Sequence, residues 1–206
     1  MRLRSLTLLL GLVLLTSCTN TSEGTPRPTP TNAPSGSEEP EGDELPFAGA
    51  PAVDDPLDTT RYQQDPCLGL TAAQTDELNV SSPGEPREAA LGKACTWGGK
   101  EDRRALVELA FLDEYPYGLS AAYQADEEGK YDFFEELPPI EGYPAVALAG
   151  TDDRQNGGCG VNVGVSDEIA FNLVIRLSTA NVDELDPCET AAMVAGMALS
   201  TMKENQ

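Results

Sequence analysis

The chain has 206 residues, with 13 basic against 35 acidic side chains and a net charge of −22. A polyanion of this size is repelled by phosphates and by anionic lipid headgroups, which excludes nucleic acid as a partner. Histidine is absent from the sequence, which excludes catalysis by a histidine base and metal sites built on imidazole.

The chain begins with a short basic segment and an aliphatic run from Leu6 to Leu15. A helix of this length spans about half of a bilayer core, which suits a signal peptide over residues 1–17 better than a permanent membrane span. The run ends in Leu15-Thr16-Ser17-Cys18, which resembles the bacterial lipobox. The resemblance implies cleavage before Cys18 and lipid attachment to its sulfur. Secretion with release and an uncleaved anchor are the alternatives.

Residues 18–61 are rich in Thr, Pro, Ser, Gly, Glu and Asp and show no hydrophobic periodicity. Nothing in such a segment offsets the entropy lost on ordering it, so we predict a disordered tether. The mean reach of a flexible tether of this length is roughly 35–40 Å. The folded domain is then predicted to occupy residues 62–206.

Helix signals stand at both ends and in the middle of this domain. Thr71 and Gln74 match a capping box that starts a short helix to about Asn79. Asp186-Pro187 supplies a capping carboxylate and a first-turn proline for a C-terminal helix. That helix has an apolar stripe, formed by Cys188, Ala192, Ala195, Leu199 and Met202. A third helix is predicted over residues 118–126.

Five segments between the helices alternate in the way that is typical of strands. They are residues 94–97, 105–111, 143–149, 161–166 and 171–177. Such alternation predicts an antiparallel sheet with one covered face. The expected fold class is therefore α+β: a single antiparallel sheet of about five strands, packed with N-terminal, middle and C-terminal helices and stapled by two disulfides.

Four cysteines are left to pair if Cys18 carries lipid. Cys95 and Cys159 each begin a predicted strand, whereas Cys67 and Cys188 each stand at a predicted helix start. Pairing the two strand cysteines with each other and the two helix cysteines with each other predicts the disulfides Cys95–Cys159 and Cys67–Cys188. Two other pairings stay open, as does a metal site of four thiolates, which the lack of a close Cys-x-x-Cys pair disfavours.

The order of these motifs is similar to that of a known family. The matching units are Asp65-Pro66-Cys67-Leu68-Gly69-Leu70-Thr71, Cys95-Thr96-Trp97, Cys159 before a valine-rich strand, and Asp186-Pro187-Cys188 before an alanine-rich helix. Together they resemble the actinobacterial lipoproteins grouped as domain of unknown function 3558. The resemblance spans about Asp65 to Met202, and it implies no activity and no catalytic residues.

One segment, residues 113–139, combines aromatic and acidic side chains. Its candidate binding residues are Tyr115, Tyr117, Tyr123, Tyr131, Phe133 and Phe134. Aromatic rings beside carboxylates can form a recognition surface for sugars, peptides or cations. The alternative is that these rings cover one edge of the core.

The carboxylates are weaker candidates for a site. A glycosidase needs two of them placed about 5–10 Å apart across a cleft, and acidic neighbours are common in so acidic a chain. The run Asp152-Asp153-Arg154-Gln155-Asn156-Gly157 partly matches a calcium loop. Because Arg154 stands at a ligand position, we predict a turn and no metal.

We therefore expect an envelope lipoprotein anchored through acylated Cys18 at the extracytoplasmic face of the cell membrane. It is expected to be no enzyme, to need no cofactor, and to bind a cell-wall ligand or an envelope protein. Two alternatives stay open. One is a carboxylate-dependent hydrolase of cell-wall glycan, and the other is a structural or assembly subunit of an envelope complex.

Overall fold

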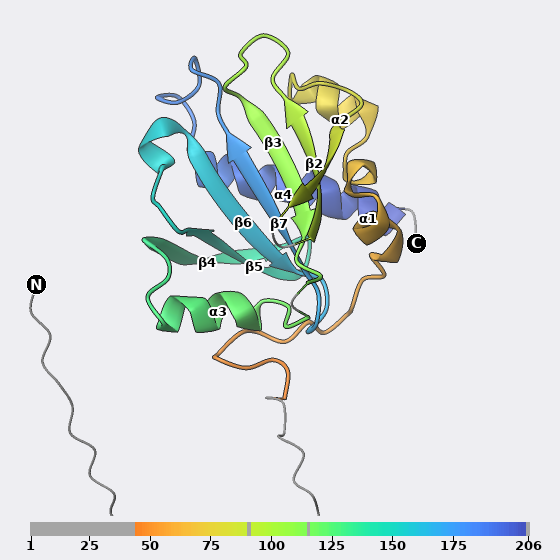
Figure 1. The fold of residues 1–206 in the computed structure, drawn as a ribbon, viewed down its shortest axis with the longest axis vertical. Coiled ribbons are helices and arrows are strands. Elements are labelled where there is room, and N and C mark those ends of the chain that lie inside the picture. Colours follow the sequence, from red (N-terminus) through yellow and green to blue (C-terminus); the bar gives the residue numbers. More distant parts are fainter. Residues whose placement is uncertain (1–43, 90–91, 115, 205–206) are drawn as a thin grey trace, which may run out of the picture. The chain divides into compact units, whose positions relative to one another are not determined.

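The structure is a computed structural model that describes residues 44–89, 92–114 and 116–204. The predicted signal peptide, Cys18, most of the predicted tether and Tyr115 lie outside these residues. The described part is α+β, with one antiparallel sheet (Figure 1). It contains two disulfides. None of its helices has the length and apolar character that a membrane crossing requires.

Seven strands make up the sheet of the described part, in the order β1-β2-β3-β7-β6-β5-β4. Along the chain they are β1 (Glu85–Ala89), β2 (Gly92–Gly98), β3 (Leu106–Phe111), β4 (Phe133–Ile140), β5 (Tyr143–Ala149), β6 (Gly158–Gly164) and β7 (Ala170–Arg176). The five predicted strands are confirmed as β2, β3, β5, β6 and β7. They hold the five central positions of the sheet.

The predicted number of about five strands was wrong because both edge strands were missed. β1 is exposed along its whole length and contains Pro86. β4 contains Pro138 and Pro139, and its register with β5 shifts between Leu137 and Ile140. Prolines and charges keep an edge strand from pairing with another chain. They also remove the alternation by which a strand is recognised.

The helices are α1 (Thr60–Gln64), α2 (Ala72–Glu77), α3 (Ser120–Glu127) and α4 (Pro187–Glu204), with short 3-10 turns η1 (Pro66–Gly69) and η2 (Arg154–Asn156). The three predicted helices are confirmed as α2, α3 and α4. Thr71 and Gln74 form the predicted capping box of α2. Asp186 caps α4, because its Oδ1 accepts the backbone N–H groups of Cys188 and Glu189 at 2.8 and 2.9 Å.

The main core lies between the sheet and α4, which runs behind the sheet in Figure 1. Alternate residues of β7, such as Leu173 and Ile175, point into this core. From α4 the core receives Ala195, Leu199 and Met202 of the predicted stripe, and Cys188 packs against it, whereas Ala192 is half-buried and lies outside the core. The helix also buries Ala191, Val194 and Ala198, because a helix that covers a sheet needs an apolar face wider than one row.

A smaller core lies on the opposite face of the sheet. There Leu119, Ala122 and Tyr123 from α3 and the residue before it pack with Val146 and Ala170. Among the described helices, α3 is the one that covers this face, and it covers one end of the sheet (Figure 1). The larger core therefore lies on the α4 face of the sheet and the smaller one on the α3 face.

Residues 44–59, which we call the N-terminal strap, were predicted as part of the tether but pack on the domain. Three backbone N–H groups of the strap bond to it: Phe47 to Ser120 Oγ at 3.0 Å, Val53 to Asp167 Oδ1 at 2.9 Å and Leu57 to the Val165 carbonyl at 2.8 Å. The predicted boundary at residue 62 was therefore too late. The apolar residues of the strap stand singly between prolines and acids and show no period, although Val53 and Leu57 pack against the main core.

Both predicted disulfide pairings were wrong. Cys67 in η1 bonds to Cys95 on β2, with a Cα–Cα distance of 5.0 Å, and Cys159 on β6 bonds to Cys188 at the start of α4, at 5.1 Å. Two strands, β3 and β7, separate β2 from β6, which places Cys95 and Cys159 roughly 14 Å apart. Bridged Cα atoms lie within about 7 Å. Strand order, which the sequence does not show, decides the pairing.

Candidate functional site

The structure divides the predicted aromatic patch. Tyr123, Tyr131 and Phe134 form one cluster, in which Phe134 lies 5.2 Å from Tyr123 and 6.2 Å from Tyr131 between ring centroids. Phe133 packs against the main core, with the Arg154 guanidinium 3.6 Å from its ring centroid. Tyr117 contacts Phe47 of the strap at 5.8 Å. The five described rings therefore do not share one surface.

Within the cluster, Tyr123 is buried and its hydroxyl donates a hydrogen bond to Glu136 Oε1 at 3.0 Å. Burial, followed by the bond to Glu136 and the charge of that carboxylate, raises the pKa of Tyr123 to about 12. Burial and the charge of Asp126 also raise the pKa of Tyr131. Such packing favours the alternative that these rings cover the edge of the sheet.

We expect the Tyr123 hydroxyl to ionise at a pH of about 12, against 10.0 for an unperturbed tyrosine. Because the folded pKa is raised, its contribution to stability is complete below pH 10 and is lost as the pH rises towards 12. The measurement is a pH titration of tyrosinate absorbance in the wild type and in Tyr123→Phe. The difference between the two curves is the ionisation of Tyr123. A difference curve centred near pH 10 would contradict the burial of the ring.

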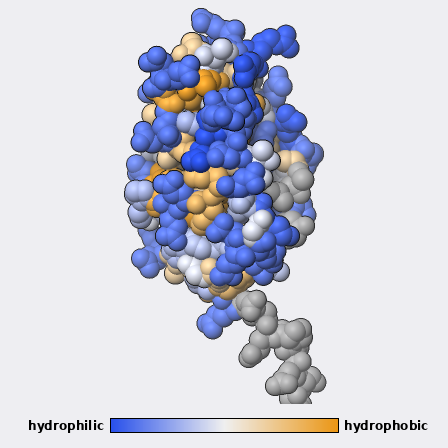
Figure 2. Space-filling view, turned by 90° about the vertical axis from the view of Figure 1, so that its left-hand side faces the viewer, coloured by the Kyte–Doolittle hydropathy of each residue, from blue (hydrophilic) through white to orange (hydrophobic). Residues whose placement is uncertain are grey.

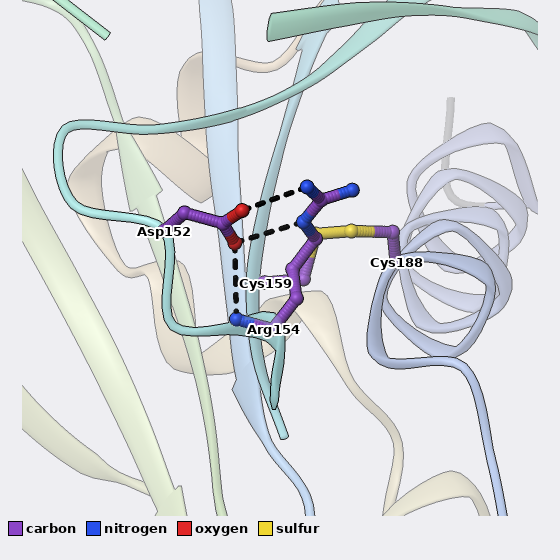
Figure 3. Close-up of polar contacts among 4 residues, drawn as sticks. All are labelled: Asp152, Arg154, Cys159 and Cys188. Atoms are coloured by element: carbon purple, nitrogen blue, oxygen red, sulfur yellow. Dashed lines mark hydrogen bonds and ion pairs between the residues drawn. A yellow bond between two sulfur atoms is a disulfide. The ribbon is translucent and has the colours of Figure 1, made fainter. Parts of the chain in front are cut away.

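The loop between β5 and β6 forms the predicted turn (Figure 3). The Arg154 guanidinium donates to both carboxylate oxygens of Asp152, at 2.8 and 2.7 Å, and these side-chain bonds lower the pKa of Asp152 to about 2. Asp153 accepts a bond from Asn156 at 2.6 Å and pairs with Arg176 at 2.7 Å. Both carboxylates thus already have cationic or amide partners, and the described residues contain no metal-binding group of three or more His, Cys, Asp or Glu.

A cavity of about 430 Å³, which we call the end cleft, opens at one end of the sheet. Its walls are the end of α2, the loop between β2 and β3, the segment after β7 and the first turns of α4. Its floor is made of buried apolar side chains, namely Val80, Val107, Ile175, Leu177 and Val194. The volume lies in the range of about 300–1,000 Å³ that is typical of small-molecule sites.

Two of the side chains that line the end cleft are apolar and exposed. Leu185 is 47% exposed and Met193 is 52% exposed. The part of the chain that the structure describes has four large apolar side chains exposed in this way, and the others are Leu68 and Tyr117. Single exposed apolar residues are ordinary, but two that line the same cavity over an apolar floor form a surface suited to an apolar ligand.

Carboxylates complete the lining of the cleft, and Glu77, Glu101 and Asp102 are its acidic members. Asp102 accepts the backbone N–H of Thr179 at 2.6 Å and that of Arg104 at 2.9 Å. The bond from Thr179, followed by that from Arg104, lowers the pKa of Asp102. Asp102 therefore ties the β2–β3 loop to the segment after β7 and fixes the spacing between two walls.

The sequence analysis missed the end cleft because its residues come from separate segments and none of them carries a motif. One signal was available. Leu185 is an apolar residue inside the acidic run Asp183-Glu184-Leu185-Asp186, and Met193 lies off the predicted stripe of α4. Apolar residues that fit no core pattern are the ones to consider for binding.

A second cavity, of about 310 Å³, lies on the face of the sheet opposite α4. It is lined by the half-buried Leu148 and Val174, and by Asn172, which donates to Asn162 Oδ1 at 2.7 Å. Arg176 lines both cavities and is held by Asp153. This cavity is smaller than the end cleft, and its lining side chains Asn172, Asp153 and Arg176 already have partners within the protein.

The carboxyl groups whose pKa is displaced all move downward. Hydrogen bonds lower the pKa of Asp58, Asp102, Asp152 and Asp153. The general acid of a glycosidase needs the opposite displacement.

The family model described as "Protein of unknown function (DUF3558)" matches residues 13–201. The match includes the strap, all four disulfide cysteines and every residue that lines the end cleft. Searches of the curated proteins and of the solved structures found no match.

Proposed function

We propose that this chain, which belongs to the DUF3558 family of proteins of unknown function, is a lipid-anchored cell-envelope lipoprotein that binds a ligand and catalyses no reaction. The anchoring part rests on Cys18 and the aliphatic run before it. The binding part rests on one observation, the end cleft with Leu185 and Met193 exposed beside an apolar floor.

The surface of the domain supports a position in water beside the membrane. Figure 2 shows one side of the molecule, where hydrophilic residues cover most of the visible face and apolar surface is broken into separate islands. The net charge of −22 adds repulsion from anionic headgroups. A domain of this kind needs a covalent anchor to stay at a membrane, and acyl chains on Cys18 would supply it.

The walls of the end cleft are fixed before a ligand arrives, which favours binding. The Cys67–Cys95 bond holds η1 on β2, and α2 follows directly with Glu77 and Leu78. The Cys159–Cys188 bond holds the start of α4, which carries Met193 one turn further on. A preformed site loses less conformational entropy on binding.

The binding proposal is tested with the mature chain and a neutral, environment-sensitive dye such as Nile red. We expect Met193→Asp to weaken dye binding at least ten-fold, because a carboxylate added to an apolar surface must be desolvated. Leu68→Asp is the matched control, since Leu68 is 40% exposed and does not line the cleft. Equal binding by the two variants would show that the cleft is not the site.

The anchoring proposal has a separate test. Mass spectrometry of the amino-terminal peptide from a membrane fraction should find Cys18 as the first residue, with acyl groups attached. A free Cys18 thiol, or cleavage at another residue, would overturn the anchor and leave the binding result unaffected.

A further inference from the structure

We infer that the end cleft selects small organic cations with an apolar body, such as alkylammonium ions. This inference rests on the proposed binding function and adds the chemical class of the ligand. It follows from two properties of the lining, an apolar floor and an acidic edge, which together match one kind of molecule.

The floor determines the body of the ligand. Val80, Val107 and Ile175 are at most 5% exposed, and they present hydrocarbon to the cavity. Leu185 and Met193 add apolar surface at the opening. A polar body would lose its hydrogen bonds to water here without replacement, whereas an alkyl or aryl body gains by leaving water.

The edge of the cleft determines the charge of the ligand. The lining contains three carboxylates, those of Glu77, Glu101 and Asp102, against one guanidinium, that of Arg176. The guanidinium is already paired with Asp153 at 2.7 Å. Lys100, the neighbour of Glu101, is likewise paired, with Asp76 at 2.6 Å.

Further acids and two arginines flank this lining. Asp183 and Glu184 stand between the lining residues Asn181 and Leu185, and Arg103 and Arg104 follow Asp102 on the β2–β3 loop. Both arginines are exposed, and neither lines the cavity. A cleft lined by one sign of charge concentrates counter-ions at its opening, so a cation is drawn in and an anion of the same shape is repelled.

The carboxylates stand on two different walls of the cleft. Asp102 is held by two backbone N–H groups, and Glu77 comes from α2 on another wall. Negative charges are therefore present on two walls of the cleft, and its floor is apolar. An ammonium group at the opening and a hydrocarbon body on the floor satisfy both surfaces at once.

The test compares three ligands with the same chain and different head groups: octylammonium, octanol and octanoate. Calorimetric titration of the mature chain should give at least ten-fold tighter binding of octylammonium than of octanol, with octanoate the weakest. Added salt should reduce the difference, because it screens exposed charges. The double variant Glu77→Gln and Glu101→Gln should lose the preference for the cation and keep its affinity for octanol.

The matched control is the double variant Glu127→Gln and Glu128→Gln at the end of α3, which changes the net charge by the same amount away from the cleft. It should keep the preference. An equal loss in both double variants would assign the selectivity to the whole protein and overturn this inference. Equal binding of all three ligands would overturn it as well, but would leave the proposed binding function standing. If none binds and Nile red does not bind either, both proposals fail.

Discussion

Replacing Trp97 with alanine should lower the free energy of unfolding by about 3–5 kcal/mol. Trp97 is 1% exposed and is the one tryptophan of the chain. It lies on β2 beneath Gly84, where an added Cβ would come within 2.6 Å of the indole Nε1 and 2.5 Å of the Cys95 sulfur. Because Gly84 has no side chain that could move into the cavity left by the indole, most of the cost of that cavity should appear in the measured free energy of unfolding.

Urea unfolding followed by far-ultraviolet circular dichroism is the suitable measurement, because the variant has no tryptophan fluorescence. Trp97→Phe keeps an aromatic ring and should lose less than the alanine variant. Met193→Ala, at a position that is 52% exposed, should stay within about 0.5 kcal/mol of the wild type. Similar values for Trp97→Ala and Met193→Ala would contradict the packing described for β2.

Removing the Cys67–Cys95 disulfide by alanine at both positions should cost about 3–4 kcal/mol of unfolding free energy. The bond joins residues 28 apart, and without it the unfolded chain regains the entropy of that loop. The Cys159–Cys188 bond spans 29 residues, so its double variant should lose nearly the same amount. This loss is a large share of the 5–15 kcal/mol that is typical of a native domain.

Equilibrium unfolding of the two double variants under non-reducing conditions gives these values. Peptide mapping without reduction supplies the independent control, since it should recover Cys67 joined to Cys95 and Cys159 joined to Cys188. Recovery of Cys95 joined to Cys159 would contradict the strand order. A loss below about 1 kcal/mol in both variants would mean that the unfolded chain already keeps these segments close together.

The sequence predicted the elements that carry their own periodic signal. The five central strands have one face in the main core, so each shows apolar residues at every second position, as in Val161 and Val163. The starts of α2 and α4 have local chemistry, a capping box at Thr71 and a capping carboxylate at Asp186. Both kinds of signal involve neighbours in sequence, and both predictions are confirmed.

The features that the sequence did not predict depend on contacts between distant segments. Edge strands β1 and β4 carry prolines and charges because each has one free side. The strap is fixed through single residues such as Val53, whose partners in the domain are more than 70 positions away along the chain. The disulfide pairing follows the order of the strands across the sheet, which no local pattern encodes.

The same distinction between local and long-range signals applies to the candidate site. Aromatic residues close in sequence suggested one patch, but alternate side chains of a strand point to opposite faces, which separates Phe133 from Phe134. The end cleft, in contrast, is assembled from side chains far apart in sequence, such as Glu77 and Met193. Its residues become a site when the sheet brings four segments to one end.

The disulfide connectivity has a consequence for how the protein matures. Within the domain, each bond joins cysteines that are consecutive along the chain, first with second and third with fourth. A polypeptide emerges from its synthesis or export machinery amino terminus first, so Cys67 and Cys95 are both available while Cys159 is still behind them. With the Cys18 sulfur occupied by lipid, as proposed, oxidation that keeps pace with emergence reaches the native bonds directly, and thiol–disulfide exchange is not needed to correct them.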